Sequence, residues 1–200
     1  MKKWFFAALI LVVLVGIRDW TRRDIDHEPG ILVAETPVQA DLPPGDVFIH
    51  RGFQLTKRAV FNIRARVLST EDYHWGADAD LSPIDLALGW GVMSDQAVLD
   101  RIDISQGSRW YRTRYQTPAP VSDHAIINHS GNMHIIPADE LVTAQLKKLR
   151  RGHVITARGL LVDVDHENGF RWRTSMRRSD TGGGSCEIFY LERLIVETLD

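Results

Sequence analysis

Apolar and polar residues alternate one by one through much of the middle and the end of this chain. The clearest case is residues 61–68, where Phe61, Ile63, Ala65 and Val67 take every second position. Side chains of a β-strand point to opposite faces with a period of two. This segment therefore predicts a strand with one apolar face.

Two further strand-like segments, residues 154–164 and 170–176, lie on either side of the dipeptide Asn168-Gly169. Asn-Gly is favoured at the centre of a tight hairpin turn, because both of its residues tolerate a left-handed backbone. The pattern predicts a β-hairpin. A last strand is predicted over residues 187–191, continued by residues 194–196.

The strongest helix signal covers residues 138–150. Val142, Leu146 and Leu149 lie on one stripe, acidic residues begin the segment, basic residues end it, and Gly152 follows. This arrangement matches the helix dipole and a glycine stop signal. It predicts a helix that packs through one face.

Two shorter helices are also predicted. Ser82 and Pro83 give a cap and a first helical position for a segment ending near residue 89 or 91, and Ser94 caps another running to about Arg101. Many short strands with few helices indicate an α+β fold, mainly antiparallel β. We expect a small barrel-like domain with two or three short helices.

The N-terminus has a different pattern. Residues 4–17 carry no charge and follow two lysines. A helix of this length covers only ~21 Å of the ~30 Å hydrocarbon core, which fits a signal peptide, and a buried helix of a soluble core is a further alternative. The following residues lack the small side chains of a signal-peptidase site, and Trp4 and Trp20 suit the two membrane interfaces. We therefore predict that residues 1–20 form an uncleaved single-pass anchor.

The rest of the chain is predicted to be a tether followed by one domain. Residues 21–46 are charged at first and then rich in proline and glycine, which is typical of a linker. Residues 47–200 would form a single mixed β domain. With this anchor in an inner membrane, the domain would be periplasmic or extracellular.

Composition narrows the function classes. The chain is 44% hydrophobic and 25% charged, which is enough apolar sequence for a single hydrophobic core. Its formal net charge of −2 gives no overall attraction to nucleic acid. It contains a single cysteine, Cys186, which excludes a disulfide within the chain. We expect no cofactor.

Polar residues gather between residues 128 and 137. This segment, predicted to be a loop, contains His129, Asn132 and His134. Histidines five residues apart fit neither one helix face nor one strand face, so we predict no metal site. The side chains would either satisfy a buried loop backbone or take part in a binding site.

A glycine-rich loop over residues 177–187 and a basic aromatic strand over 109–115 are the other candidate binding elements. Three consecutive glycines let a backbone approach a ligand closely, and arginines supply charge for an anion. Aromatic rings beside guanidinium groups suit glycans or anionic headgroups, although aromatics in the core with solvated arginines would give the same pattern. The candidate ligand-binding residues are Trp110, Arg112, Asn132, Arg177, Arg178 and Asp180.

A catalytic alternative uses the lone cysteine. Cys186 would be the nucleophile, His129 or His134 would hold its proton, and Arg193 would stabilise an oxyanion. The order His, Cys, Arg resembles that of sortases, which implies a membrane-anchored transpeptidase or hydrolase of envelope peptides. The sequence departs from sortases at Gly184-Ser185, where they have a Thr-rich strand before the cysteine.

A wider resemblance covers most of residues 30–192. The segments at 81–95, 132–137, 180–182 and 186–187 resemble a family of small bacterial envelope proteins with a hydrophobic N-terminus and no known activity. The resemblance implies an envelope location and transfers no catalytic residue. We predict a non-catalytic binding or accessory domain, held to the membrane through residues 4–17, with an envelope protein, glycan or anionic ligand as partner and no nucleic acid.

Overall fold

The computed structural model describes residues 23–43, 45–177, 179–180, 182 and 184–198. The predicted anchor over residues 1–20 and the candidate Arg178 lie outside these residues. Within the described part of the chain, no helix combines the length and the apolar character that crossing a bilayer requires.

One long strand, β3 (Phe53–Asp72), organises the sheet because it pairs antiparallel with four others. It pairs first with β2 (Val47–His50), then with β1 (Val38–Asp41), and through its last third with β4 (Ile84–Gly89). Along most of its length it also pairs with β8 (Val154–Asp165). The apolar alternation of residues 61–67 lies in the middle of this strand.

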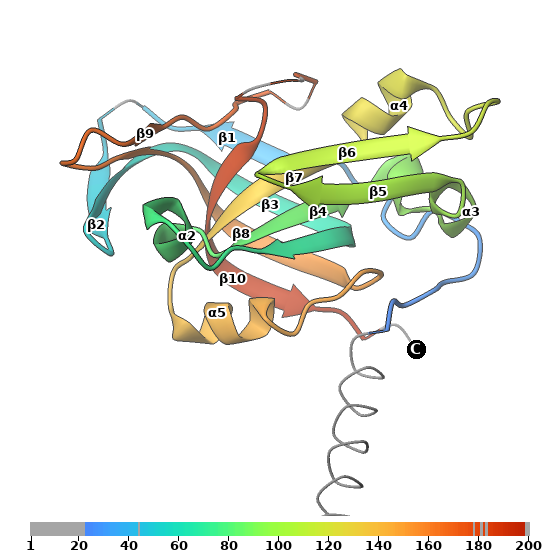
Figure 1. Cartoon of the computed structure of the whole chain (residues 1–200), viewed down its shortest axis with the longest axis horizontal. Helices are drawn as coiled ribbons and strands as arrows, with labels where there is room; N and C mark the ends of the chain where they lie inside the picture. The colour runs from blue at the N-terminus through green and yellow to red at the C-terminus, as the bar shows by residue number, and fades with distance from the viewer. Residues whose placement is uncertain (1–22, 44, 178, 181, 183, 199–200) are drawn as a thin grey trace, which may run out of the picture.

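From β4 the pairings lead back to β3. β4 pairs antiparallel with β7 (Ser130–Pro137), β7 pairs parallel with β10 (Glu187–Val196), and β10 pairs antiparallel with β8. The short β9 (Arg171–Trp172) extends β8 at the sheet edge. A mainly antiparallel β fold with a few short helices, as predicted, is confirmed (Figure 1).

A separate hairpin and several short helices surround this sheet. The hairpin consists of β5 (Ile102–Gly107) and β6 (Trp110–Tyr115). The helical elements are α2 (Ala77–Leu81), η1 (Gly91–Ser94), α3 (Gln96–Leu99), α4 (Asp123–Asn128) and α5 (Glu140–Leu146).

The main core fills the space between the paired strands. Phe61, Ile63, Ala65 and Val67 are all buried, which confirms the strand predicted from their alternation. Phe61 contacts Phe189 of β10 edge to face, with ring centroids 5.2 Å apart. Such a pair adds to the gain from burying both rings.

Two predictions were wrong in kind. Residues 82–91 do not form a helix: they contain β4, whose six residues are all buried. A short apolar run that is buried on both faces shows no alternation of apolar and polar residues. The sequence therefore contains no strand signal to set against the helix-cap signal of Ser82-Pro83. Residues 128–137 are not a loop, because Ser130 to Pro137 form β7, with Met133 and Ile135 in the core.

Other elements differ in extent. The helix predicted over 138–150 is limited to α5, which Asp139 caps by accepting from the backbone of Val142. The helix from Ser94 begins instead behind Asp95, whose carboxylate accepts from the backbone of Ala97. The hairpin after β8 forms, but β9 covers only two residues of the predicted 170–176 strand.

The segment predicted as a tether lies against the domain. Val33 is fully buried, its N–H donates to Ser94 Oγ (3.0 Å), and its carbonyl accepts from Gly91 (2.7 Å). Nearer the start, Ile25 N–H donates to the carbonyl of Arg151 (2.9 Å). Because β1 pairs with β3 as part of the sheet, the folded part begins well before Val47.

Gly152 makes the docking of this N-terminal segment possible. Its φ is +95°, and a Cβ built there would lie 2.1 Å from the carbonyl oxygen of Ile25. Gly169 shares the left-handed backbone (φ +90°) but has nothing within 4 Å of such a Cβ. Comparing substitutions at the two glycines therefore separates the effect of backbone strain from the effect of close contact with Ile25.

We expect Gly152→Ala to destabilise the protein by about 2–4 kcal/mol and Gly169→Ala by about 1 kcal/mol, because only the first adds a clash to the left-handed penalty. Urea unfolding measures both values. Hydrogen exchange of the amides of residues 25–33 should speed up in Gly152→Ala alone. Equal effects of the two substitutions would contradict the proposed role of this contact.

Candidate functional site

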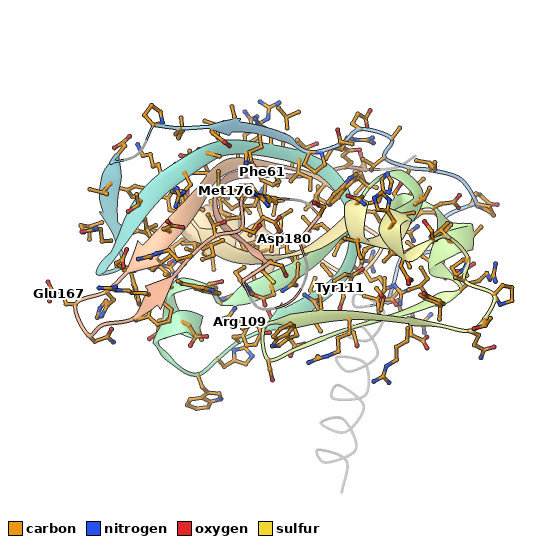
Figure 2. All side chains as sticks on the ribbon, turned by 90° about the horizontal axis from the view of Figure 1, so that it is seen from above. Phe61, Arg109, Tyr111, Glu167, Met176 and Asp180 are labelled. Carbon is orange, nitrogen blue, oxygen red and sulfur yellow. The ribbon has the colours of Figure 1, made fainter. Side chains whose placement is uncertain are left out.

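The site lies on the outer face of β4 and β7. Because strand side chains alternate, Leu86, Met133 and Ile135 point into the core, while Asp85 and His134, which are register partners, point to the opposite face. The β5–β6 hairpin and the loop between β9 and β10 cover that face. Figure 2 shows Arg109, Tyr111 and Asp180 gathered between these elements, whereas Glu167 marks the far tip of the β8–β9 hairpin.

Asp85 is the centre of the polar network on this face. Its carboxylate is fully buried, and Oδ1 lies 2.7 Å from Arg109 Nη1 and 2.9 Å from His134 Nδ1. The arginine contact is a hydrogen bond, whereas the histidine contact is within ion-pair distance but not aligned as a hydrogen bond. Asn132 Nδ2 lies 3.4 Å from Oδ2. A buried carboxylate needs such partners to offset its desolvation.

Arg109 reaches Asp85 from a strained turn. Ser108 and Arg109 form the two-residue connection of the hairpin, and both have positive φ (53° and 66°) although neither is glycine. The hydroxyl of Tyr73 accepts from Arg109 N–H (2.8 Å), and the guanidinium lies 3.7 Å from the centre of the Tyr73 ring. Arg109 also donates to Asp78 (3.1 Å). These contacts hold a backbone conformation that is otherwise unfavourable.

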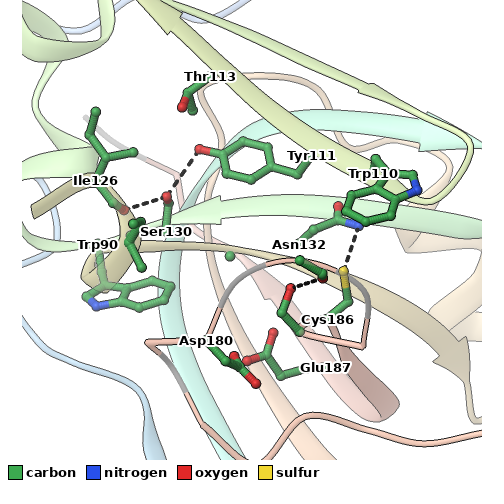
Figure 3. A pocket seen from close by; sticks show the side chains of 14 residues that line it. Trp90, Trp110, Tyr111, Thr113, Ile126, Ser130, Asn132, Asp180, Cys186 and Glu187 are labelled. Atoms are coloured by element: carbon green, nitrogen blue, oxygen red, sulfur yellow. Dashed lines mark hydrogen bonds between the residues drawn. The ribbon is translucent and has the colours of Figure 1, made fainter. Parts of the chain in front are cut away.

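Two adjoining hollows open beside this network, and Figure 3 shows the larger of them. The larger has a volume of about 210 Å³, and the smaller, of about 160 Å³, is lined in part by His134 and Trp172. They share Trp110 and Cys186. The side chains of the larger hollow that matter here are Trp90, Trp110, Tyr111, Asn132, Asp180 and Glu187.

The thiol of Cys186 lies between amide and carboxylate groups. Asn132 Nδ2 is 3.7 Å from Sγ. Burial raises the pKa of Cys186 to about 11, and the negative charges of Glu187, Asp85 and Asp180 act in the same direction. A thiol with such a pKa is protonated at neutral pH and is a poor nucleophile.

Tyr111 forms one wall of the larger hollow. Burial raises its pKa to about 12, so its hydroxyl stays protonated, and it donates to Ser130 Oγ at 3.1 Å. Asn132 Oδ1 accepts from Gln106 of the same hairpin at 2.6 Å. These bonds tie the hairpin to β7 and fix the shape of the hollow.

The structure brings some predicted site residues together. Trp110, Asn132, Asp180 and Cys186 line the larger hollow, and His134 lines the smaller one with Cys186. These residues come from three segments that are far apart in the sequence: β6, β7 and the connection from β9 to β10.

Other predicted site residues lie elsewhere. His129 ends α4, where its Nδ1 is 2.8 Å from the carbonyl of Ala125. Arg193 is exposed on β10, seven residues past Cys186 and so roughly 20 Å along the strand. Arg112 and Arg177 are exposed and line neither hollow.

Four residues of the site were not predicted from the sequence: Asp85, its buried partner Arg109, Trp172 and Glu187. A carboxylate within an apolar run, as in residues 84–89, was the one local signal for Asp85, because such a residue requires a partner. Trp172 lies with its ring centroid 4.5 Å from that of His134, a contact that depends on the fold of the whole hairpin. Among the described residues, no group of three acidic, histidine or cysteine side chains is arranged to hold a metal ion.

Alkylation of Cys186 should follow the raised pKa. In the native chain the rate with iodoacetamide should still rise about tenfold per unit at pH 10, whereas the urea-unfolded chain should level off near its ordinary pKa of about 8.5. At pH 8 the native thiol should react about a hundredfold more slowly. A native profile that levels off near pH 8.5 would contradict the raised pKa, and one that levels off well below pH 8.5 would show an activated thiolate.

The Arg109–Asp85 pair gives a stability prediction. Arg109→Met leaves a buried carboxylate without its main partner and should cost about 3–5 kcal/mol in urea unfolding. Adding Asp85→Asn should recover part of that loss, giving a coupling of about 1–3 kcal/mol. Arg112→Met, on the exposed face of β6, should change stability by less than about 0.5 kcal/mol. Simple additivity of the Arg109 and Asp85 substitutions would contradict the pairing.

Comparison of the chain with protein-family models, with curated proteins and with solved structures found no match. The function of the site has to be inferred from the chemistry of its own side chains.

Proposed function

We propose that this chain is a membrane-anchored bacterial envelope protein whose domain is a small five-stranded barrel with a non-catalytic binding site. The cycle of pairings β3–β4–β7–β10–β8–β3 supports the barrel. A helix, α5, lies along the chain between β7 and β8, which are the third and fourth of these five strands in sequence order. This order, with one parallel pair, is that of the OB-fold.

The position of the site supports a binding function. OB-folds bind ligands on the face of their second and third strands and with the loops after the first and fourth strands. Here the equivalents are β4, β7, the segment 73–83 and the segment 166–186. Asp85, Asn132 and Cys186 lie on or beside this face. Because this is an argument by fold analogy, the chemistry of the hollow carries more weight.

The single observation that carries the proposal is the larger hollow, with aromatic walls and a few polar groups. Trp90 lies on its buried side, and Trp110, 45% exposed, lies at its rim. An apolar wall with a small number of polar groups is typical of sites for small ligands. The two adjoining hollows together exceed the ~300 Å³ at which such sites begin.

The charges favour a neutral glycan over an anion. Asp180 and Glu187 line the larger hollow, and carboxylates repel anions but accept hydrogen bonds from sugar hydroxyls. The guanidinium of Arg109 is already engaged by Asp85 and Asp78. An aromatic ring at the rim gives the apolar face of a sugar a surface to pack on.

A second candidate function is a cysteine hydrolase or transpeptidase. The observation that favours it is the position of His134, which contacts Asp85 on one side and borders the smaller hollow together with the thiol of Cys186. The raised pKa of the thiol argues against it, and Arg193 is too distant to stabilise an oxyanion there. The alkylation profile of Cys186 separates the two functions.

Binding of a neutral glycan is tested with chitotetraose, titrated into the full-length protein in detergent and followed by calorimetry. We expect binding that Trp110→Ala and Asn132→Ala each weaken at least tenfold, a loss of about 1.4 kcal/mol. Trp75→Ala is the matched control, because Trp75 is exposed and lines neither hollow. Absence of binding, or equal loss in the control, would count against the glycan site.

A further inference from the structure

A second, strongly polar groove lies away from the candidate binding site. It has a volume of about 600 Å³ and runs between the end of β3, Ile104 of β5 and the connection from α5 to β8. Its charged lining consists of Lys147, Lys148, Arg150, Arg151, Asp24 and Asp72. Four basic against two acidic side chains give an excess of two positive charges in a chain whose formal net charge is −2.

The two lysines of this groove are exposed and unpaired within the described part of the chain. Arg151 lies 3.9 Å from Asp24, and Arg150 donates to the carbonyl of Arg23 at 3.1 Å. Lys147 and Lys148, at the end of α5, make no ion pair with any described carboxylate. The fold therefore holds two ammonium groups ready for an external anion.

The chain enters the domain at this groove. Arg23, Asp24 and the N–H of Ile25 contact residues 150–151, and the carbonyl of Ile25 also accepts from Arg66 of β3 at 3.4 Å. Residues 18–22 separate the apolar run ending at Ile17 from Arg23, and an extended chain covers at most about 3.5 Å per residue. The groove thus lies within roughly 20 Å of the end of the proposed anchor.

Apolar side chains flank the lysines. Trp75 is 91% exposed and Leu141, on the outer side of α5, is 69% exposed. The segment carrying Trp75 packs near α5, because Tyr73 and His74 share a further hollow with Thr143 and Lys147. Tryptophan beside lysine is the combination that prefers a membrane interface. Figure 1 places α5 and the start of the described chain along the same lower edge.

We propose that this surface, made of Trp75, Leu141, Lys147, Lys148, Arg150 and Arg151, lies on the bilayer and binds the headgroups of anionic phospholipids. The inference rests on the proposed membrane anchor. Juxtamembrane basic residues are attracted to anionic lipid within a Debye length of the surface. The surface orients the domain on the membrane, a role separate from the glycan site.

Lysine acetylation of the full-length protein in nanodiscs tests this directly. The chain contains Lys2, Lys3, Lys57, Lys147 and Lys148, and Lys57 pairs with Asp46 away from the groove. We expect Lys147 and Lys148 to react at least threefold more slowly in phosphatidylglycerol-containing discs than in phosphatidylcholine discs. The difference should shrink at 1 M salt, while Lys57 reacts equally in both.

Variants and a soluble anion complete the test. Lys147→Glu with Lys148→Glu should abolish the quenching of Trp75 by brominated phosphatidylglycerol, read as the difference from Trp75→Phe, whereas Lys57→Glu should leave it unchanged. Equal acetylation of all three domain lysines in both discs overturns the proposal. Protection in phosphatidylcholine discs by inorganic phosphate alone also overturns it, because the groove would then be a site for a soluble anion.

Failure of the anchor is distinguishable from failure of this surface. If the full-length protein does not enter nanodiscs, the anchor is wrong, and the same variants are compared by sedimentation with phosphatidylglycerol and phosphatidylcholine vesicles. Preference for phosphatidylglycerol that the double lysine variant loses would still support the surface. No preference would overturn it.

Discussion

The site depends on one constraint, which is that the carboxylate of Asp85 is buried and must be paired. The strand that carries it belongs to the ring of pairings, so Asp85 cannot move to solvent without opening that ring. Its partners have to come to it: His134 from the neighbouring strand and Arg109 from the hairpin turn. The strained backbone at Ser108 and Arg109 follows from this demand, and so does the position of the hairpin over the face.

Local pattern was enough to predict the middle of β3, where the alternation of residues 61–67 is visible in the sequence. It also predicted β8 and β10 as strand-like apolar segments, although both faces of these strands carry buried residues. It failed for β4, where Ser82-Pro83 gives a helix-cap signal, and for β7, where polar residues interrupt the apolar ones. Asn132 and His134 read as polar loop residues, although the hairpin covers them. The hairpin that buries these side chains is more than twenty residues away, so the local sequence of β7 does not show that they are buried.

The candidate site was predictable to the extent that its chemistry is unusual. Cys186, Asn132 and Trp110 were selected because of residue type, and the structure places them around one hollow. Their arrangement was not predictable, because it depends on the parallel pairing of β7 with β10, which brings residues 132 and 186 beside each other. The docked N-terminal segment was missed for a similar reason: Gly152 accommodates it, and a glycine does not reveal what approaches it.

The two surfaces fit one orientation of the domain. In Figure 1 the connection from β9 to β10 lies at the top of the domain and the β5–β6 hairpin lies in its upper half, whereas α5 and the start of the described chain lie along the lower edge. If the lysines of α5 contact the bilayer, the hollow is held on the side away from it. A glycan of the envelope would then meet the domain from the aqueous side. The basic groove thus supplies orientation, and the Asp85 network supplies the shape of the binding surface.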